Sequence, residues 1–172
     1  MFGDYPSNAP LWDNPLNLYV GPFANPNSHQ ATSAANRIMF MAFSVGRRVT
    51  VTNVRFPVVT SSGNVDVGIA DEGFNRLTST GSTPCPASGT VANLPLLTPV
   101  TLVPGVRYWA LFAVDNATAI FATYGIGGSA GSLLLLLNAN VAGRGATISF
   151  PIPDPVPAPT QGADRVFVTW FY

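Results

Sequence analysis

The chain has 172 residues, of which 47 % are hydrophobic, so it is large enough for one compact domain with its own core. Charged residues make up only 9 %, well below the roughly 25 % usual in soluble domains. Eight arginines balance eight acidic residues, and no basic stripe is present to hold phosphates, which argues against nucleic acid as a partner. Because so few charges oppose self-association, we expect a protein that works in an assembly.

Residues 1–35 differ in character from the rest of the chain. Their frequent prolines exclude helix and central strand. The large apolar side chains among them are too many for a solvated linker. We interpret the segment as an extended arm that docks on a larger particle or a neighbouring subunit, with folding back across its own domain as the alternative. The docking side chains would be Tyr5, Leu11, Trp12, Leu16, Tyr19 and Phe23.

Two segments bear on export and membrane insertion, and neither suggests them. Residues 1–14 lack the basic and apolar regions of a secretory signal, so we expect synthesis in the cytoplasm without a signal peptide. The aliphatic run Leu133–Leu137 is far shorter than the roughly 20 residues that a spanning helix needs. Its glycine-rich and asparagine-rich flanks favour a buried strand.

Residues 36–172 are expected to form one all-β domain, an antiparallel β-sandwich of the jelly-roll type. Short apolar runs alternate with turn residues, and no long stretch has a helical period. The prolines at every second position of residues 151–159 predict an extended connection across one end of the sandwich. The expected strands are residues 37–43, 49–56, 65–70, 76–79, 90–94, 100–103, 106–114, 119–124, 133–137, 146–150 and 165–171.

Side-chain alternation separates two kinds of strand. Val65, Val67 and Ile69 alternate with small or polar residues, which predicts one face toward water. The strands near residues 38–43, 106–114 and 166–171 are apolar on both faces, so each needs the arm, a loop or another subunit as a second cover. We therefore expect a homo-oligomer, without deciding which apolar faces are core. The interface candidates are Met39, Met41, Phe43, Trp109, Leu111, Phe167 and Phe171.

Three segments together resemble a known family. Residues 49–56 read Val-Thr-Val-Thr-Asn-Val-Arg-Phe, residues 63–73 contain Asn-Val-Asp-Val-Gly-Ile-Ala-Asp, and residues 102–113 contain Pro-Gly-Val-Arg-Tyr-Trp-Ala-Leu. This order resembles the jelly-roll fibre-head and minor tail domains of tailed bacteriophages, in which a V-x-x-G-I-Y-D strand precedes an L-x-x-G-x-Y-W-L-A strand. Here Ala70 stands where an aromatic residue is common, and Phe74-Asn75-Arg76 replaces a glycine-rich loop. The resemblance implies a trimer that acts as a host-binding tip or a virion decoration.

Few residues are available for catalysis or metal binding. His29, the single histidine, lies in the arm, and Cys85, the single cysteine, lies between two prolines. No Cys-His or Ser-His-Asp arrangement is therefore supported. One cysteine and one histidine are also too few ligands for a zinc site built from these residue types. Asp71 and Glu72 are the one adjacent acidic pair. An ordinary turn explains them, and a calcium site completed by backbone carbonyls is the alternative. A carboxylate pair for glycoside cleavage would depend on tertiary contacts.

Other motifs favour structural interpretations. Gly125–Gly131 lacks the lysine and the following helix of a phosphate loop, so it is expected to be a flexible hairpin connection. Trp12, Trp109 and Trp170 are candidates for sugar stacking, but the last two lie in expected strands and are assigned to core or interface. Tyr124 is a further candidate for contact with a glycan.

The sequence therefore predicts a non-enzymatic structural protein of a tailed-phage virion. The leading hypothesis is a small tail-fibre or tail-tip head subunit that forms a homotrimer, binds other virion proteins, contacts a host-surface glycan and needs no cofactor. The first alternative is a capsid decoration protein, either a head fibre or a cement protein. The second is a free, monomeric carbohydrate-binding module, and a hydrolase is a distant third.

The chain ends on Trp170-Phe171-Tyr172, which suggests that the last strand is built into the sandwich. We expect deletion of Phe171 and Tyr172 to lower the melting temperature by several degrees, because the strand would lose buried aromatic surface. A thermal melt followed by circular dichroism measures this. An unchanged melt would mean that the last strand does not contribute to the core.

Overall fold

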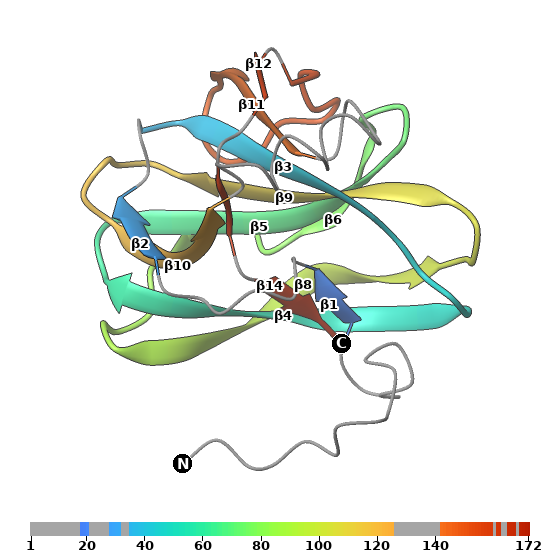
Figure 1. Cartoon of the computed structure of the whole chain (residues 1–172), viewed down its shortest axis with the longest axis horizontal. Helices are drawn as coiled ribbons and strands as arrows, with labels where there is room; N and C mark the ends of the chain where they lie inside the picture. The colour runs from blue at the N-terminus through green and yellow to red at the C-terminus, as the bar shows by residue number, and fades with distance from the viewer. Residues whose placement is uncertain are drawn as a thin grey trace.

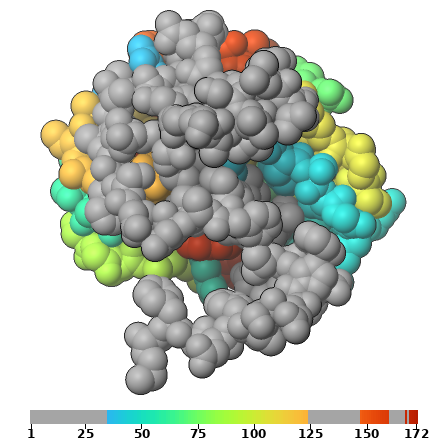
Figure 2. Space-filling view, in the orientation of Figure 1, coloured from blue at the N-terminus to red at the C-terminus, as the bar shows by residue number. Residues whose placement is uncertain are grey.

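The computed structural model describes residues 18–20, 28–31, 35–125, 142–159, 161–162, 165–167 and 169–172. Within these residues all regular structure is β, and two antiparallel sheets pack as a sandwich (Figure 1). The predicted all-β sandwich is therefore confirmed. In the space-filling view, green, lime and yellow residues from the middle of the chain lie along the rim of the molecule (Figure 2).

The chain passes repeatedly from one sheet to the other between strands. Most strands that are hydrogen-bonded to each other are therefore distant in sequence. Sheet A contains β1 (Leu18–Val20), β2 (Ser28–Ala31), β4 (Val49–Thr60), β8 (Thr90–Leu102), β10 (Ile120–Gly125), β13 (Arg165–Phe167) and β14 (Thr169–Phe171). Sheet B contains β3 (Arg37–Ser44), β5 (Asn64–Asp71), β6 (Arg76–Ser79), β7 (Thr83–Pro84), β9 (Arg107–Val114), β11 (Ala142–Thr147) and β12 (Gln161–Gly162).

One expected break in the strand order is wrong. The segments 90–94 and 100–103 form the single strand β8, which follows β4 with a register shift between Val51 and Asn53. Pro95 and Pro99 do not end this strand because, among the described strands, β8 pairs only with β4, and proline is tolerated where a backbone edge has no partner. The expected strand 133–137 lies outside the described residues, and β11 ends before most of the expected strand 146–150.

Two pieces of the N-terminal arm join sheet A of the same chain. β1 pairs with β14 through Leu18 and Phe171, and β2 pairs with β10, where His29 lies opposite Ala122. Tyr19 lies in β1 opposite Trp170. The other docking residues that the sequence predicts lie outside the described residues: Tyr5, Leu11, Trp12, Leu16 and Phe23.

The space between the sheets is filled by an aromatic ladder. Phe112 of β9 stacks on Phe167 with ring centroids 4.3 Å apart. The Phe112 ring also meets Phe121 and Phe56 edge-on, at 4.8 and 5.3 Å. These geometries are the favoured ones for aromatic pairs. The ladder joins β4, β9, β10 and β13, so it connects the two sheets through one continuous core.

A second apolar layer covers the outer face of sheet B. Residues 148–159, which we call the proline strap, lie against it, so the expected position of this connection across one end of the sandwich is wrong. The strap buries Ile148, Ile152 and Val156, which are spaced four residues apart, while Pro151, Pro155 and Pro157 are exposed. The strap residues pack with Ile38, Phe40, Ala70, Trp109, Leu111 and Ala113.

A polar cluster fixes one end of the sandwich, where the turn before β5 meets the turn after β9. The Asp115 carboxylate accepts hydrogen bonds from the backbone N–H of Asn64 at 2.8 Å and from its side-chain amide at 2.6 Å. Asn116 donates to the Ser62 carbonyl at 2.8 Å. Gly63 lies between these groups with φ at +58°, and a Cβ added there would stand 2.2 Å from both Asp115 and Asn116 side chains.

We expect Gly63→Ala to lower the free energy of unfolding by about 2 to 4 kcal/mol, because backbone strain and steric displacement of Asp115 and Asn116 combine. Gly89→Ala is the matched control, since Gly89 also has a positive φ, +73°, but has no atom within 4 Å of an added Cβ. It should cost only the backbone term, about 1 to 2 kcal/mol. Urea denaturation measures both, and equal losses would contradict the role given to the cluster.

Candidate functional site

The most unusual polar residue of the described chain is Asp66, in the middle of β5. Its side chain is 0 % exposed, so the predicted water-facing side of this strand is wrong. The proline strap covers that side. The carboxylate accepts a hydrogen bond from the backbone N–H of Ile152 at 3.0 Å and from the Thr80 hydroxyl at 3.3 Å. Asp66 therefore anchors the strap to sheet B.

Burial dominates the ionisation of this carboxyl. Removal from water raises the pKa of Asp66 above its ordinary value of 3.8, although hydrogen bonds from Ile152, Ser79 and Thr80 and the charge of Arg76 oppose the shift. The folded state keeps the Asp66 proton to a higher pH than the unfolded chain does. The free energy of unfolding therefore falls as the pH rises from about 3.8 through the folded-state pKa.

Three further hydrogen bonds join the strap to β6 and to the turn before it. The Arg76 guanidinium donates to the Ile152 carbonyl, and the Arg76 backbone N–H donates to the Asp154 carboxylate at 3.2 Å. The Val156 N–H donates to the Phe74 carbonyl at 2.9 Å, and Phe74 itself has a positive φ of 64°. The strap is thus held at several points to one sheet, and its charged partners are Asp66 of β5 and Arg76 of β6.

Under the strap lies an aromatic cluster centred on Trp109. Phe74 stacks on the Trp109 ring at 5.4 Å, and Phe40 meets both rings edge-on at about 6 Å. The Arg107 guanidinium lies 4.5 Å from the Trp109 ring centroid. Trp109 is 3 % exposed, and its indole N–H has no hydrogen-bond acceptor among the described residues. A ring this deeply covered offers no face for sugar stacking, in agreement with its assignment to the core.

Of the acidic pair, Asp71 is the last residue of β5 and Glu72 begins the turn that follows. Both oxygens of the Asp71 carboxylate accept hydrogen bonds from the Asn75 side chain, at 3.1 and 2.8 Å, and the Asn75 N–H donates at 2.9 Å. These bonds hold the pKa of Asp71 below its usual value. Glu72 is exposed. Across the described ranges, no group of at least three His, Cys, Asp or Glu residues is placed to hold a metal ion.

The interface candidates from the sequence lie within the packing of a single chain. Met41, Phe167 and Phe171 are buried between the sheets, and Trp109 and Leu111 are buried under the strap. Met39 and Phe43 are half-buried against the core between the sheets. The second apolar face, which suggested another subunit, is thus covered by the chain's own strap, and the burial of these residues gives no reason to place an interface on them.

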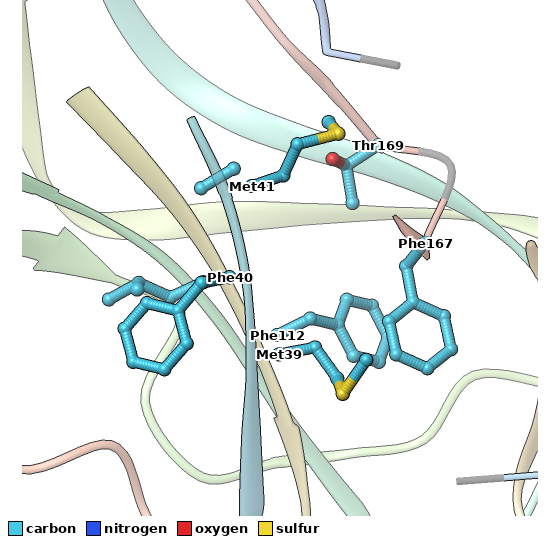
Figure 3. Close-up of a pocket in the computed structure, with 8 residues that line it drawn as sticks. Met39, Phe40, Met41, Phe112, Phe167 and Thr169 are labelled. Atoms are coloured by element: carbon cyan, nitrogen blue, oxygen red, sulfur yellow. The ribbon is translucent and has the colours of Figure 1, made fainter. Parts of the chain in front are cut away.

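A small hollow remains where β3 faces β13 and β14 (Figure 3). Its lining residues are Met39, Phe40, Met41, Ala110, Leu111, Phe112, Phe167 and Thr169. The rings of Phe112 and Phe167 lie side by side, Met39 lies next to them, and Met41 lies beside Thr169, while Phe40 points to the other side of β3 (Figure 3). Thr169 supplies the only hydroxyl of this lining, so the hollow suits apolar packing and not polar catalysis.

A second polar arrangement lies on the outer face of sheet A. The Arg55 guanidinium lies 4.4 Å from the Tyr172 ring centroid, and the Tyr172 hydroxyl donates to the Asn93 side chain. Asn53 also donates to Asn93, at 3.3 Å. The register places Arg55 between Trp170 of β14 and Asn93 of β8. An arginine, amides and aromatic rings thus share one face, which is chemistry that can recognise hydroxyl-rich ligands.

The sequence did not identify either of these two polar arrangements. Asp66 follows the alternation of an ordinary half-exposed strand, and only the strap, 86 positions further on, turns it into a buried group. Arg55, Asn93 and Tyr172 lie on three strands that pair only in the sheet. The one signal in the sequence that could have indicated a buried carboxylate was the position of Asp66 in the middle of a motif strand. The Gly125–Gly131 connection falls almost entirely outside the described residues, and of Tyr124 only the strand position is described.

The described residues contain no helix that is long and apolar enough to cross a membrane. Cys85 is a half-buried free thiol near the end of the sandwich.

A comparison with known protein families finds no match for the chain, and no curated protein matches it.

We expect Asp66→Ala to lower the free energy of unfolding by about 1 to 3 kcal/mol, because the buried Ile152 N–H loses its acceptor. Asp66→Asn is the matched control: its carbonyl can accept from Ile152 and its amide can donate to Thr80. It should stay close to the wild type near pH 4. Urea denaturation of each variant measures the difference.

The same variants test the pH dependence. Above the folded-state pKa the wild type buries a charge that Asp66→Asn lacks, so Asp66→Asn should gain stability relative to the wild type as the pH rises. The pKa values of Asp71 and Asp115 are lowered, and their contributions cancel in this comparison because both chains contain them. A difference that does not change with pH, or equal losses for the two variants, would contradict the anchoring role of Asp66.

Proposed function

We propose that this chain is a non-enzymatic structural protein of a tailed-phage virion, a small tail-fibre or tail-tip head subunit that functions in assembly and contacts the host. It forms a homotrimer with other copies and binds further virion proteins. The observation that carries the proposal is that the two strands whose sequences resemble the phage motifs pair with each other. These are β5 and β9, which are neighbours from Val65 opposite Val114 to Asp71 opposite Tyr108.

Gly68, the glycine of the first motif strand, supports treating this sequence motif as a structural unit. A Cβ added at Gly68 would stand 2.6 Å from the Thr78 carbonyl and 2.8 Å from the Ser79 Cβ. Only glycine allows β6 to approach β5 this closely. The glycine of the V-x-x-G pattern therefore has a packing reason in this chain, which is the close approach of β6 to β5.

The chemistry of the described residues also favours a role in assembly. Asp66, the one carboxylate that is buried in the described part of the chain, holds the strap, and Asp71 and Asp115 each fix a turn. None of these acids has a histidine or a second carboxylate as a described hydrogen-bond partner. A role in recognition, not in bond cleavage, fits these arrangements.

The outer face of sheet A favours a second candidate function. Arg55, Asn93 and Tyr172 form a connected polar and aromatic surface, which suits contact with a glycan. In a virion protein this surface would contact a host polysaccharide. In a free carbohydrate-binding module it would be the whole function, and the protein would then be a monomer.

Immunogold labelling of purified phage particles tests the proposal, with pre-immune serum as the control. We expect label at the tail tip. Label spread over the head would instead identify a capsid decoration protein, the alternative virion role. If intact particles carry no label and the isolated protein binds glycans as a monomer, the carbohydrate-binding module replaces the virion protein as the assigned function.

A further inference from the structure

The outer face of sheet A carries a positive charge that no acidic side chain of the sheet can neutralise. The strands described for sheet A contain no aspartate and no glutamate. The acidic side chains of the described residues lie in sheet B, in its turns and in the proline strap: Asp66, Asp71, Glu72, Asp115 and Asp154. Arg55, in the middle of β4, is exposed, and within the described part of the chain its guanidinium contacts a ring and no carboxylate.

The Arg55 side chain is held in place by Tyr172. Its guanidinium lies over the Tyr172 ring, 4.4 Å from the centroid, which is a favourable position for a cation. Tyr172 follows β14, and its ring reaches across β4, because its hydroxyl donates to Asn93 of β8 (Figure 1). The Tyr172 N–H also donates to the Asn53 carbonyl at 3.1 Å. The guanidinium is therefore preorganised, so a ligand that binds it loses little affinity to ordering the side chain.

Asn93 adds a second hydrogen-bond donor beside Arg55. The register places the two residues directly opposite each other, and both are exposed. The Asn93 side-chain oxygen accepts from the Tyr172 hydroxyl and from the Asn53 amide, whereas the Asn93 NH₂ group has no acceptor among the described residues. An amide NH₂ and a guanidinium only donate. Two adjacent donors, one of them charged, are complementary to an anion that only accepts.

We propose that this face binds a saccharide that carries a carboxylate, with Arg55 and Asn93 as the donors to that carboxylate. The inference rests on the proposed contact between this face and a glycan, and it names the chemical class of the glycan. A guanidinium matches the two oxygens of a carboxylate in geometry and charge. Trp170, half-buried on the other side of Arg55, and the ring of Tyr172 supply aromatic surface for the sugar rings.

A saccharide suits this face better than an acidic peptide does. β4 pairs with β14 on one side and with β8 on the other, so a peptide backbone that reached Arg55 would find no strand edge to pair with. The remaining polar groups of the face are amides and hydroxyls, such as the exposed Thr50 and Thr101, whose hydroxyls lie 2.8 Å apart. These groups both donate and accept, as sugar hydroxyls do.

Isothermal titration calorimetry of the full chain tests the proposal. The probes are oligomers of galacturonic acid and of mannuronic acid, each beside its carboxyl-reduced form of the same length. We expect at least one acidic oligomer to bind about tenfold or more tightly than its reduced form, and salt to weaken this preference.

Two variants should abolish the preference for the acidic oligomer. Arg55→Gln removes the charge, and Asn93→Asp keeps an acceptor for Tyr172 and Asn53 but places a negative charge beside the ligand carboxylate. Arg48→Gln is the matched control, because it removes the same charge at an exposed position between β3 and β4, and it should keep the preference. Circular dichroism should show the wild-type fold for all three variants, since the substituted residues are exposed.

The possible failures can be told apart. Acidic and reduced oligomers that bind equally would overturn the carboxylate but leave the contact with a glycan. A preference that survives Arg55→Gln would place the acidic saccharide elsewhere and overturn this site. An oligomer of glutamate that binds as tightly as the acidic saccharides would replace the saccharide with an acidic peptide. If no oligosaccharide binds, both this inference and the glycan contact fail, whereas the virion assignment is decided by the location of the label on particles.

Discussion

The hydrogen bond between the Asp66 carboxylate and the Ile152 N–H is the contact on which the outer layer of sheet B depends. It adds a backbone donor to the Thr80 hydroxyl bond of this buried carboxylate, and it helps to hold the strap over Trp109, Leu111 and Phe40. Without the strap, these side chains would form an exposed apolar face. One buried polar contact thus allows β9 to be apolar on both sides within a single chain.

The two sheets consequently present different surfaces. Sheet B is closed by its own strap, whereas the outer face of sheet A carries the polar arrangement of Arg55, Asn93 and Tyr172. β8 takes part in that polar face, because Asn93 lies directly opposite Arg55. The Thr78 hydroxyl of β6 donates to the Thr98 carbonyl of β8 and so joins the two sheets along this strand.

Part of this organisation could be read from local patterns. The strand 76–79 was predicted with its observed bounds. This prediction succeeds because turn residues and alternation act over a few positions. The break expected between residues 94 and 100 is absent, because the tolerance of a strand for proline depends on where that strand lies in the sheet.

The sequence by itself determined that this protein is an all-β sandwich with few charges, since composition and side-chain period are local properties. Only the tertiary structure decided which residues became the site. Asp66 changed from a water-facing residue to a buried anchor because a strap 86 positions away covers it. Trp109 and Leu111 changed from interface candidates to core for the same reason. Whether a residue is buried depends on which segment packs against its face of the strand, and alternation along one strand carries no information about that segment.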